Sequence, residues 1–291
     1  MTALCTGRSV IVTGAGQGLG RAHALEFARH GARLVLGDVS PAVEELAAEI
    51  RADGREAVAS VGDVSDWAYA AGLIDTAVRA HGRLDTLVNN AGINRDRMLV
   101  TMSEEEWDLV LRVDLKGHFA PLQHAAAHWR VRSKAGEQVT ACVVNTSSGA
   151  GLMGSVGQGN YAAAKAGVAA LTQVAAVELA RYGVVVNAIA PSARTAMTEQ
   201  VFGEAMKKPD TGFDAMDPAN VSPLVVWLGS AAAAGVTGRM FEVAGGEISL
   251  ADGWRHGKPV TRDSRWPAEE LGPVIAGLVA RAEPPTPVYG A

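Results

Sequence analysis

The sequence predicts an α/β protein: one domain built on a doubly wound parallel sheet of about seven strands, with helices on both faces. Short β-branched runs alternate with helical patterns along most of the chain, and this alternation is typical of parallel sheets. A glycine-rich turn separates the first predicted strand from the first helix, and Asp38 ends the second strand. We expect residues 1–250 to form this domain and residues 251–291 a C-terminal extension.

Each predicted strand contains a short apolar run. The strands are expected at residues 8–13, 33–38, 56–63, 138–148, 183–191 and 240–243, and residues 84–92 are expected to form a further strand and the loop after it. Apolar residues at helical spacing predict helices at residues 21–31, 42–54, 65–82, 104–133, 161–182, 220–234 and 267–282. Ser103 and Glu106 fit a capping box before the fourth helix, and we expect Pro121 to kink that helix.

Composition excludes several functional classes. A net charge of −5 and an isoelectric point near 5.8 argue against nucleic-acid binding, which needs a basic face. Two long uncharged runs are rich in glycine and small polar residues or interrupted by proline, unlike membrane spans. With only Cys5 and Cys142 and no recognisable signal peptide, we expect a cytoplasmic protein. No metal site is expected.

A long irregular segment, residues 192–219, follows the sixth predicted strand. Loops of this length in compact domains are often lids over a binding site. Its large apolar side chains could cover an apolar substrate, and they could equally pack the segment against the domain. These residues are Met197, Phe202, Met206, Phe213 and Met216.

The glycine-rich turn predicts a site for a dinucleotide. Backbone at such a turn can approach a pyrophosphate at a helix N-terminus, where free N–H groups favour negative charge. The pattern is T-G-x-x-x-G-x-G from Thr13 to Gly20, and it does not match G-x-G-x-x-G because residue 19 is leucine. Its position between a predicted strand and a predicted helix supports the assignment.

Asp38 predicts NAD as the cofactor. A carboxylate at the end of the second strand can accept both ribose hydroxyls, and it repels a 2′-phosphate. No lysine or arginine occupies positions 17, 19 or 39, where a phosphate could be bound. The alternative is that Asp38 only caps the entry to the next helix. Asp63 and Val64, after the third strand, could flank an adenine.

Three side chains around residues 148–165 predict the chemistry. Tyr161 and Lys165 lie four residues apart and share one face of a helix. A nearby ammonium favours the phenolate, so we expect a lowered pKa for Tyr161 and proton exchange with a substrate oxygen. Ser148 can donate a hydrogen bond to that oxygen. An isolated Tyr-x-x-x-Lys has little weight, because it also fits an ordinary amphipathic helix.

Taken together, these motifs resemble the classical type of the short-chain dehydrogenase/reductase family, whose fold is of the Rossmann type. The resemblance covers about residues 7–246 and rests on Thr13–Gly20, on Asn89-Asn90-Ala91-Gly92 and on the spacing of Ser148, Tyr161 and Lys165. It implies that Ser148 polarises the substrate oxygen, that Tyr161 is the general acid/base and that Lys165 holds the nicotinamide ribose. The implied cofactor-binding residues are Gly14, Gln17, Gly18, Leu19, Gly20, Asp38, Asp63, Val64, Asn90, Ala91, Gly92, Tyr161, Lys165, Pro191, Ser192 and Thr195.

Two residues depart from the family pattern. Asp114 stands where the family usually has a catalytic asparagine that holds a water relay behind the lysine. An aspartate keeps the shape of the asparagine, but its charge offsets part of the pull of Lys165 on Tyr161. We therefore expect a working but altered proton relay. Ser192 follows Pro191, where the family mostly has glycine.

These departures look more like the dehydrogenase units of peroxisomal-type multifunctional β-oxidation enzymes than like acyl-carrier-protein reductases. The implied substrates are (3R)-hydroxyacyl-CoA thioesters or hydroxysteroids. Lys207 and Lys208 could contact a CoA phosphate, although a solvated pair is the simpler interpretation. The resemblance also implies a homotetramer with helices 104–133 and 161–182 at an interface, although the small residues of those helices would fit a monomer core equally well.

The main interpretation is an NAD(H)-dependent oxidoreductase that interconverts a secondary alcohol and a ketone. One alternative is a 3-oxoacyl-[acyl-carrier-protein] reductase, which a preference for NADPH would favour. The other is a non-catalytic NAD-binding sensor, for which Asp114 is the only support.

Overall fold

A computed structural model gives the structure of the chain and describes residues 3–198, 203–251, 253, 254, 256–283, 286 and 288. Its centre is one eight-stranded sheet in the order β3-β2-β1-β4-β5-β6-β7-β8. The strands are β1 Ser9–Thr13, β2 Arg33–Asp38, β3 Ala57–Val61, β4 Thr86–Asn89, β5 Ala141–Thr146, β6 Val184–Ser192, β7 Met240–Ala244 and β8 Glu247–Leu250. All neighbouring pairs are parallel except β7 and β8. The predicted doubly wound parallel sheet is confirmed.

Helices connect the parallel strands, as the alternating pattern predicts. They are α1 Gly18–Arg29, α2 Ala42–Ala52, α3 Trp67–His81, α4 Glu104–Val110, α5 Gly117–Lys134, α6 Gly149–Met153, α7 Gly159–Leu179, α9 Ser222–Leu228 and α10 Leu271–Val279. A π-helical turn, η1 Leu111–Lys116, joins α4 to α5. Short 3₁₀ turns are η2 Ala180–Tyr182, η3 Gly203–Met206, η4 Pro218–Asn220, η5 Ala231–Ala233 and η6 Ala268–Glu270.

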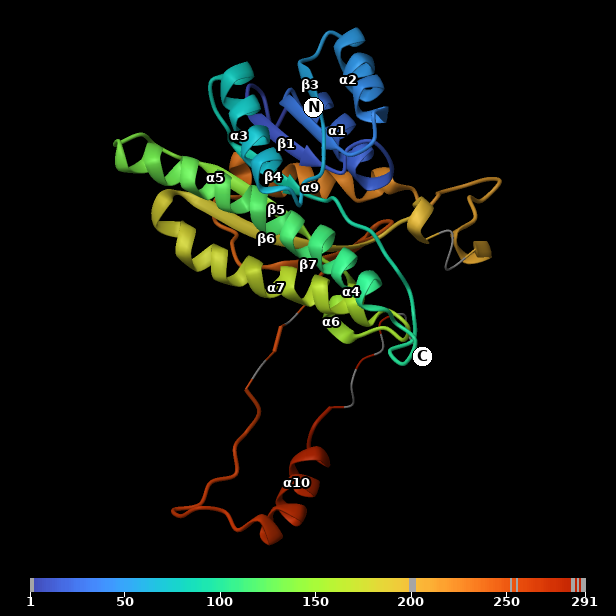
Figure 1. Ribbon diagram of the computed structural model, residues 1–291, viewed down its shortest axis with the longest axis vertical. Coiled ribbons are helices and arrows are strands. Elements are labelled where there is room, and N and C mark those ends of the chain that lie inside the picture. Colours follow the sequence, from blue (N-terminus) through green and yellow to red (C-terminus); the bar gives the residue numbers. More distant parts are fainter. Residues whose placement is uncertain are drawn as a thin grey trace.

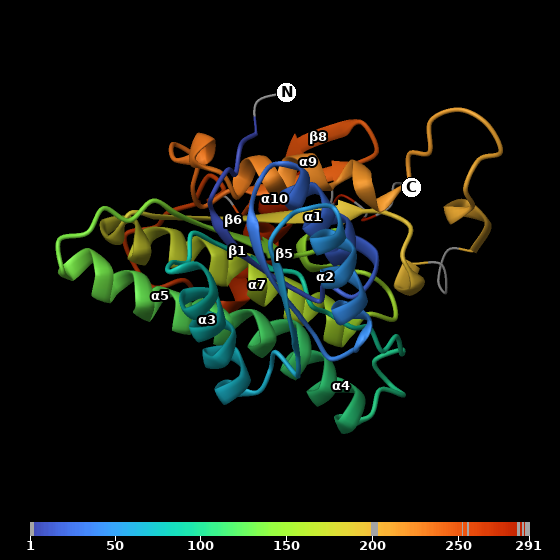
Figure 2. The ribbon, with the colours of Figure 1, turned by 90° about the horizontal axis from the view of Figure 1, so that it is seen from above.

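The sheet is buried on both faces. In β1, Val10 and Val12 pack toward α1, α2 and α9, whereas Ile11 packs toward α3, α5 and α7. Figure 2 shows α9 on one side of β6 and α5 and α7 on the other. Burial on both faces explains why the strands are continuous apolar runs without polar alternation.

The eighth strand was not predicted. The chain turns back after β7 at Gly245 and Gly246, and β8 pairs Ile248 with Val243. All four residues of β8 are exposed, so the strand has no buried apolar stripe that a pattern search would find. The Gly-Gly pair was the available signal, because two such residues between short strands often form a hairpin turn.

The predicted helix 104–133 is divided into three parts. The capping box of Ser103 and Glu106 is confirmed at the start of α4. The irregularity comes at η1, before the expected kink site, and Pro121 lies inside α5. One extra residue in the turn causes such a π-bulge, and apolar spacing does not reveal it. A further short helix, α6, lies between the predicted strand 138–148 and the predicted helix 161–182, where no element was predicted.

The strand order places the carboxyl ends of β1 and β4 side by side at the point where the winding reverses. In open α/β sheets, ligands bind in the crevice at this point. On length and composition alone, the stretch Gly159–Tyr182 could cross a membrane. In the fold, however, this stretch packs on the sheet and contains the buried Lys165.

Candidate active site

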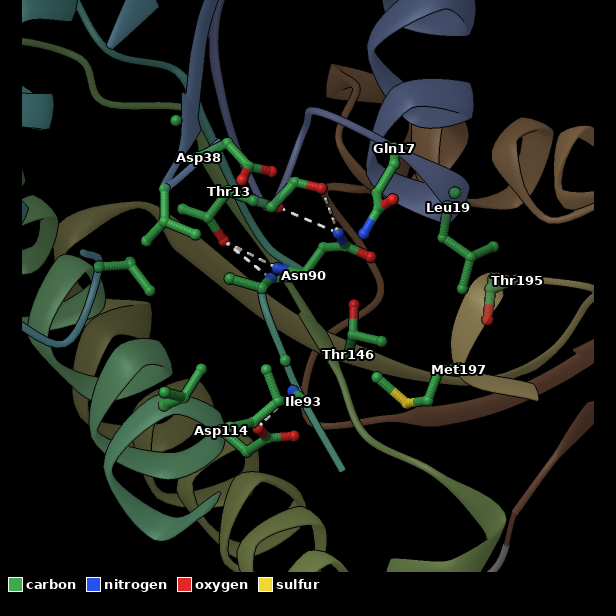
Figure 3. A pocket seen from close by; sticks show the side chains of 18 of the residues that line it. Thr13, Gln17, Leu19, Asp38, Asn90, Ile93, Asp114, Thr146, Thr195 and Met197 are labelled. Atoms are coloured by element: carbon green, nitrogen blue, oxygen red, sulfur yellow. Dashed lines mark hydrogen bonds between the residues drawn. The ribbon is translucent and has the colours of Figure 1, made fainter. Parts of the chain in front are cut away.

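The turn between β1 and α1 is tied to the loop after β4 by hydrogen bonds. The Thr13 hydroxyl accepts from the backbone N–H groups of Asn90 and Ala91 at 3.0 and 3.2 Å. The Asn90 side-chain amide donates to the carbonyls of Thr13 and Gly14 at 3.0 and 3.2 Å (Figure 3). Thr13 belongs to the glycine motif, but its role in joining the two loops was not predicted.

The glycines of this turn are required by space and conformation. Gly14 has φ +64°, and a Cβ there would lie 2.8 Å from the Cα of Ala91. A Cβ on Gly20 would lie 2.0 Å from the carbonyl oxygen of Gly14. The turn therefore brings backbone close to any molecule at the start of α1. Among the residues that the structure describes, no side chain caps that helix, and its first turn holds no acidic residue, so its free N–H groups fit a pyrophosphate.

A cavity of about 380 Å³ begins at this turn. Most of the predicted cofactor-binding residues line it: Gly14, Gln17, Gly18, Leu19, Asp38, Asp63, Val64, Asn90, Ala91, Gly92, Tyr161, Lys165, Pro191 and Thr195. Two predicted residues do not. Gly20 packs against the backbone of Gly14, and Ser192 lines a neighbouring cavity.

Thr146, at the end of β5, also lines this cavity and was not predicted. Its hydroxyl is buried and has no hydrogen-bond partner among the described residues, and Figure 3 shows it beside the cavity. A buried hydroxyl without a partner costs free energy until a ligand supplies one. Together with the glycine turn, this observation fits a dinucleotide in this cavity, to which Thr146 could supply a hydrogen bond.

Asp38 accepts two backbone hydrogen bonds. One carboxylate oxygen accepts from the N–H of Gly16 and the other from the N–H of Ser40, both at 2.8 Å. These bonds match the alternative assignment of Asp38 as a cap. They also hold the carboxylate at the wall of the cavity, where each oxygen retains a lone pair for a ribose hydroxyl.

Helix α7 brings Tyr161 and Lys165 to one face, as their spacing predicts. The Lys165 ammonium lies 5.5 Å from the centre of the Tyr161 ring. Ser148 ends the loop after β5 and caps α6, accepting from the N–H of Ala150 at 3.2 Å. Ser147, its neighbour, donates to the carbonyl of Lys165 at 2.8 Å and fixes the end of β5 against α7.

Behind the tyrosine, Lys165 and Asp114 form a buried ion pair. The ammonium lies 3.2 Å from one carboxylate oxygen of Asp114 and donates to the carbonyl of Thr146 at 3.0 Å. The other oxygen of Asp114 accepts from the N–H of Ile93 at 2.8 Å (Figure 3). A Cβ on Gly92 would lie 2.9 Å from the carboxylate, so only glycine fits beside the pair. Asp114 thus replaces the asparagine of the family at a position that η1 supplies.

The expected lowering of the tyrosine pKa is wrong for this structure. Burial raises the pKa of Tyr161; Lys165 opposes the rise, and the negative charge of Asp114 adds to it. Burial also raises the pKa of the Asp114 carboxyl, against the attraction of Lys165. The sequence indicated the cation, but it could not indicate how strongly the site is desolvated.

A second cavity, of about 720 Å³, opens in front of Ser148 and Tyr161. It shares Pro191 and Met197 with the first cavity. Of the predicted lid residues, Met197 and Met206 line it, Phe213 is exposed, and Phe202 lies outside the described residues. Whether residues 192–219 act as a lid stays a prediction.

The arrangement can exchange a proton with an oxygen atom in the second cavity. The Tyr161 phenol lines this cavity and can take or give the proton, while the Ser148 hydroxyl beside it can donate to the same oxygen. The Lys165 ammonium favours the phenolate form during the transfer. A bound nicotinamide supplies the hydride acceptor or donor for the carbon that carries this oxygen.

Known proteins with similar sequences support this assignment. A family model described as short chain dehydrogenase matches residues 8–205. The hydroxyacyl-CoA dehydrogenase ChsB1 of Mycobacterium tuberculosis is 46% identical over 96% of this chain and 90% of its own length. The 3-oxoacyl-[acyl-carrier-protein] reductase of Synechocystis sp. is 39% identical over 85% of this chain and 99% of its own.

A larger relative and a crystal structure support the same family assignment. The peroxisomal multifunctional enzyme type 2 of Mus musculus is 39% identical over 83% of this chain, which spans only 32% of that relative. A crystal structure of a short chain dehydrogenase from Mycobacterium avium has a TM-score of 0.91 and 57% identity, covering 99% of this chain and 100% of that one. The resemblance drawn from the motifs is confirmed. The chain belongs to the short chain dehydrogenase family and is an oxidoreductase that interconverts an alcohol and a ketone with a nicotinamide cofactor.

Proposed function

We propose that the substrate is a 3-hydroxyacyl-CoA thioester of the (3R) series or its 3-oxo product. The observation that carries the proposal is the 720 Å³ cavity in front of Ser148 and Tyr161, in a chain that is 46% identical to a hydroxyacyl-CoA dehydrogenase over 96% of its length. A cavity of this size is within the range that binds a drug-sized ligand. Lys207 and Lys208 are exposed directly after Met206, which lines the same cavity, and they could contact a CoA phosphate. A hydroxysteroid is a further candidate for a cavity of these dimensions.

NAD(H) is the proposed cofactor. The Asp38 carboxylate lies in the wall of the first cavity, and the neighbouring positions Gln17, Leu19 and Val39 carry no positive charge. A 2′-phosphate would meet the negative charge of Asp38 there, and none of these three positions supplies a cation to pair with it.

The catalytic roles of Ser148, Tyr161, Lys165 and Asp114 are part of the same proposal. A homotetramer and a cytoplasmic location are proposed as well. Support for assembly comes from apolar side chains exposed on the outer faces of α5 and α7: Phe119, Val131, Val174 and Val177. Support for a reducing compartment comes from Cys5 and Cys142, which are both buried as free thiols.

One experiment tests substrate and cofactor together. Reduction of NAD⁺ and NADP⁺ is followed by absorbance with 3-hydroxyacyl-CoAs of both configurations, hydroxysteroids and simple secondary alcohols. We expect the highest kcat/KM with a (3R)-hydroxyacyl-CoA and NAD⁺. A preference for NADP⁺ would favour the acyl-carrier-protein reductase, to which the chain also has a relative of 39% identity. Binding of NADH without turnover of any substrate would favour the sensor.

The Asp38→Asn variant tests the cofactor assignment on its own. Asparagine keeps an acceptor for a backbone N–H but removes the charge. The ratio of kcat/KM with NADP⁺ to kcat/KM with NAD⁺ should therefore rise about tenfold, or ~1.4 kcal/mol. The matched control is Asp53→Asn, at the C-terminal end of α2, which does not line the cavity. An unchanged NADP⁺/NAD⁺ ratio in the Asp38 variant would mean that the carboxylate is only a structural cap.

A further inference from the structure

The described residues after β8 form an arm that leaves the domain. Its helix α10 projects away from the sheet and its covering helices (Figure 1). No residue of α10 is buried, and Ile275 and Val279 are 52% and 68% exposed. The arm therefore contributes little to the core.

One residue beyond α10 lies at the reaction centre. Val288 lines the second cavity together with Ser148 and Tyr161. Its Cγ1 atom lies 3.4 Å from the position that a Cβ on Gly149 would occupy, which is ordinary van der Waals contact. Gly149 directly follows Ser148, the residue to which we assign the polarisation of the substrate oxygen. An apolar side chain from the end of the sequence thus lies beside the start of α6.

The other walls of this cavity show what Val288 can add. Glu242, Glu247 and Ser249 form a polar side on β7 and β8, and Met197 and Met206 form an apolar side. Val288 is partly buried and branched at Cβ, so its side chain has few rotamers and makes a stiff wall. A wall next to Ser148 limits the bulk of whatever group is attached to the reacting carbon.

We propose that Val288 is a specificity-determining residue, which closes the substrate cavity beside Ser148 and sets the size of the substituent on the carbinol carbon. The proposal rests on the second cavity being the substrate site. It assigns to the C-terminal extension a part in substrate selection that the glycine and tyrosine motifs do not reveal.

Engineered disulfides test the position without any substrate. In a Gly149→Cys/Val288→Cys variant, mild oxidation should form a bond within one chain, because the two side chains come within disulfide reach. The matched control pairs Gly149→Cys with Val279→Cys on the projecting helix α10. Non-reducing electrophoresis and peptide mass spectrometry identify the product. Oxidation no greater than in the control, or a bond between two chains, would overturn the assignment.

Enlarging the side chain tests its function. Val288→Trp should lower kcat/KM for the bulkiest substrates of the panel at least tenfold more than for the smallest. Val279→Trp, the same change on α10, should leave that ratio unaltered. Binding of NADH should remain as in the unmodified protein, because Val288 does not line the first cavity, and this readout separates a blocked pocket from misfolding.

The two assays separate this inference from the proposed function. An unchanged substrate ratio in Val288→Trp would refute the role in specificity even if the enzyme turns over hydroxyacyl-CoAs. If no substrate of the panel is turned over, the proposed function fails, and the disulfide assay alone decides whether Val288 closes the cavity.

Discussion

Asp114 shows how one carboxyl group changes the electrostatics of a site in which Ser148, Tyr161 and Lys165 keep the family pattern. It is fully buried, and it pairs with Lys165 while accepting from the N–H of Ile93. The pair places a negative and a positive charge behind the same phenol, so part of the effect of the ammonium on Tyr161 is cancelled. Burial therefore decides the direction of the shift, and the pKa of Tyr161 is raised.

Replacing Asp114 by asparagine should move the pH dependence of alcohol oxidation. In the proposed mechanism, oxidation needs the phenolate of Tyr161, whose pKa burial raises and the Asp114 charge raises further. Without that charge the pKa falls, so the acidic limb of the kcat/KM profile shifts to lower pH. Turnover should fall less than about tenfold, because Asn keeps the oxygen that accepts from Ile93.

The control for this prediction is Asp108→Asn, an exposed aspartate on α4. It should leave the profile in place. An Asp114→Asn variant with a large loss of turnover at every pH would show that the carboxylate itself is required.

His23 makes stability depend on pH. It is fully buried beside the Ser222 hydroxyl, 2.9 Å from Nδ1, and burial lowers its pKa to about 3. Since its ordinary pKa is 6.5, the neutral ring contributes stability above that pH, and this contribution is lost as the pH falls from about 6.5 toward 3. The slope for one group is at most ~1.4 kcal/mol per pH unit.

We therefore expect His23→Gln to show a shallower loss of unfolding free energy between pH 6.5 and 4 than the unmodified protein does. Chemical denaturation at several pH values measures the slope. His256→Gln, at an exposed histidine, serves as the control. Equal slopes in all three proteins would show that protonation of His23 does not contribute to the pH dependence of the unfolding free energy.

At the scale of elements, the sequence predicted those whose patterns are local. The β1–α1 turn, the placement of Tyr161 and Lys165 on one helix and the capping box of α4 all follow from short-range spacing. The π-turn η1, the short helix α6 and the exposed strand β8 did not. Each of these depends on packing or on one inserted residue, neither of which leaves a periodic signal.

Ser103 is predicted to stabilise the start of α4. Its hydroxyl accepts from the N–H of Glu106, and the Glu106 carboxylate accepts from the N–H of Ser103. Ser103→Ala should cost ~1 kcal/mol, which lowers Tm by about 2–4 °C in a domain of this size. Ser103→Asp keeps an acceptor and should restore Tm. Thermal unfolding measures both, and an equal loss in the two variants would contradict the capping role.

For the whole molecule, the doubly wound parallel sheet with helices on both faces could be predicted because all seven parallel strands are apolar runs joined by helices. The size of the cavities and the position of Val288 could not. They depend on contacts between residues far apart in the sequence, and no short-range pattern records these.

Assembly is the prediction that belongs to this scale. Val177, on the outer face of α7, is 80% exposed in the single chain. If α5 and α7 pair between subunits, Val177→Glu places two like charges at the interface and should reduce the mass seen by light scattering to that of a smaller assembly. Glu178→Ala, at the next exposed position, is the control. An unchanged mass in Val177→Glu would place the interface elsewhere.

The two cavities adjoin. Tyr161, Pro191 and Met197 line both of them, so only these side chains need to be spanned to pass from the first cavity to the one in front of Ser148. One inhibitor that links an adenosine fragment to an acyl tail can therefore occupy both chambers at once. Once one half is bound, the linker holds the other half at a high effective concentration near its own cavity. The selectivity of the inhibitor among related enzymes would come from the tail.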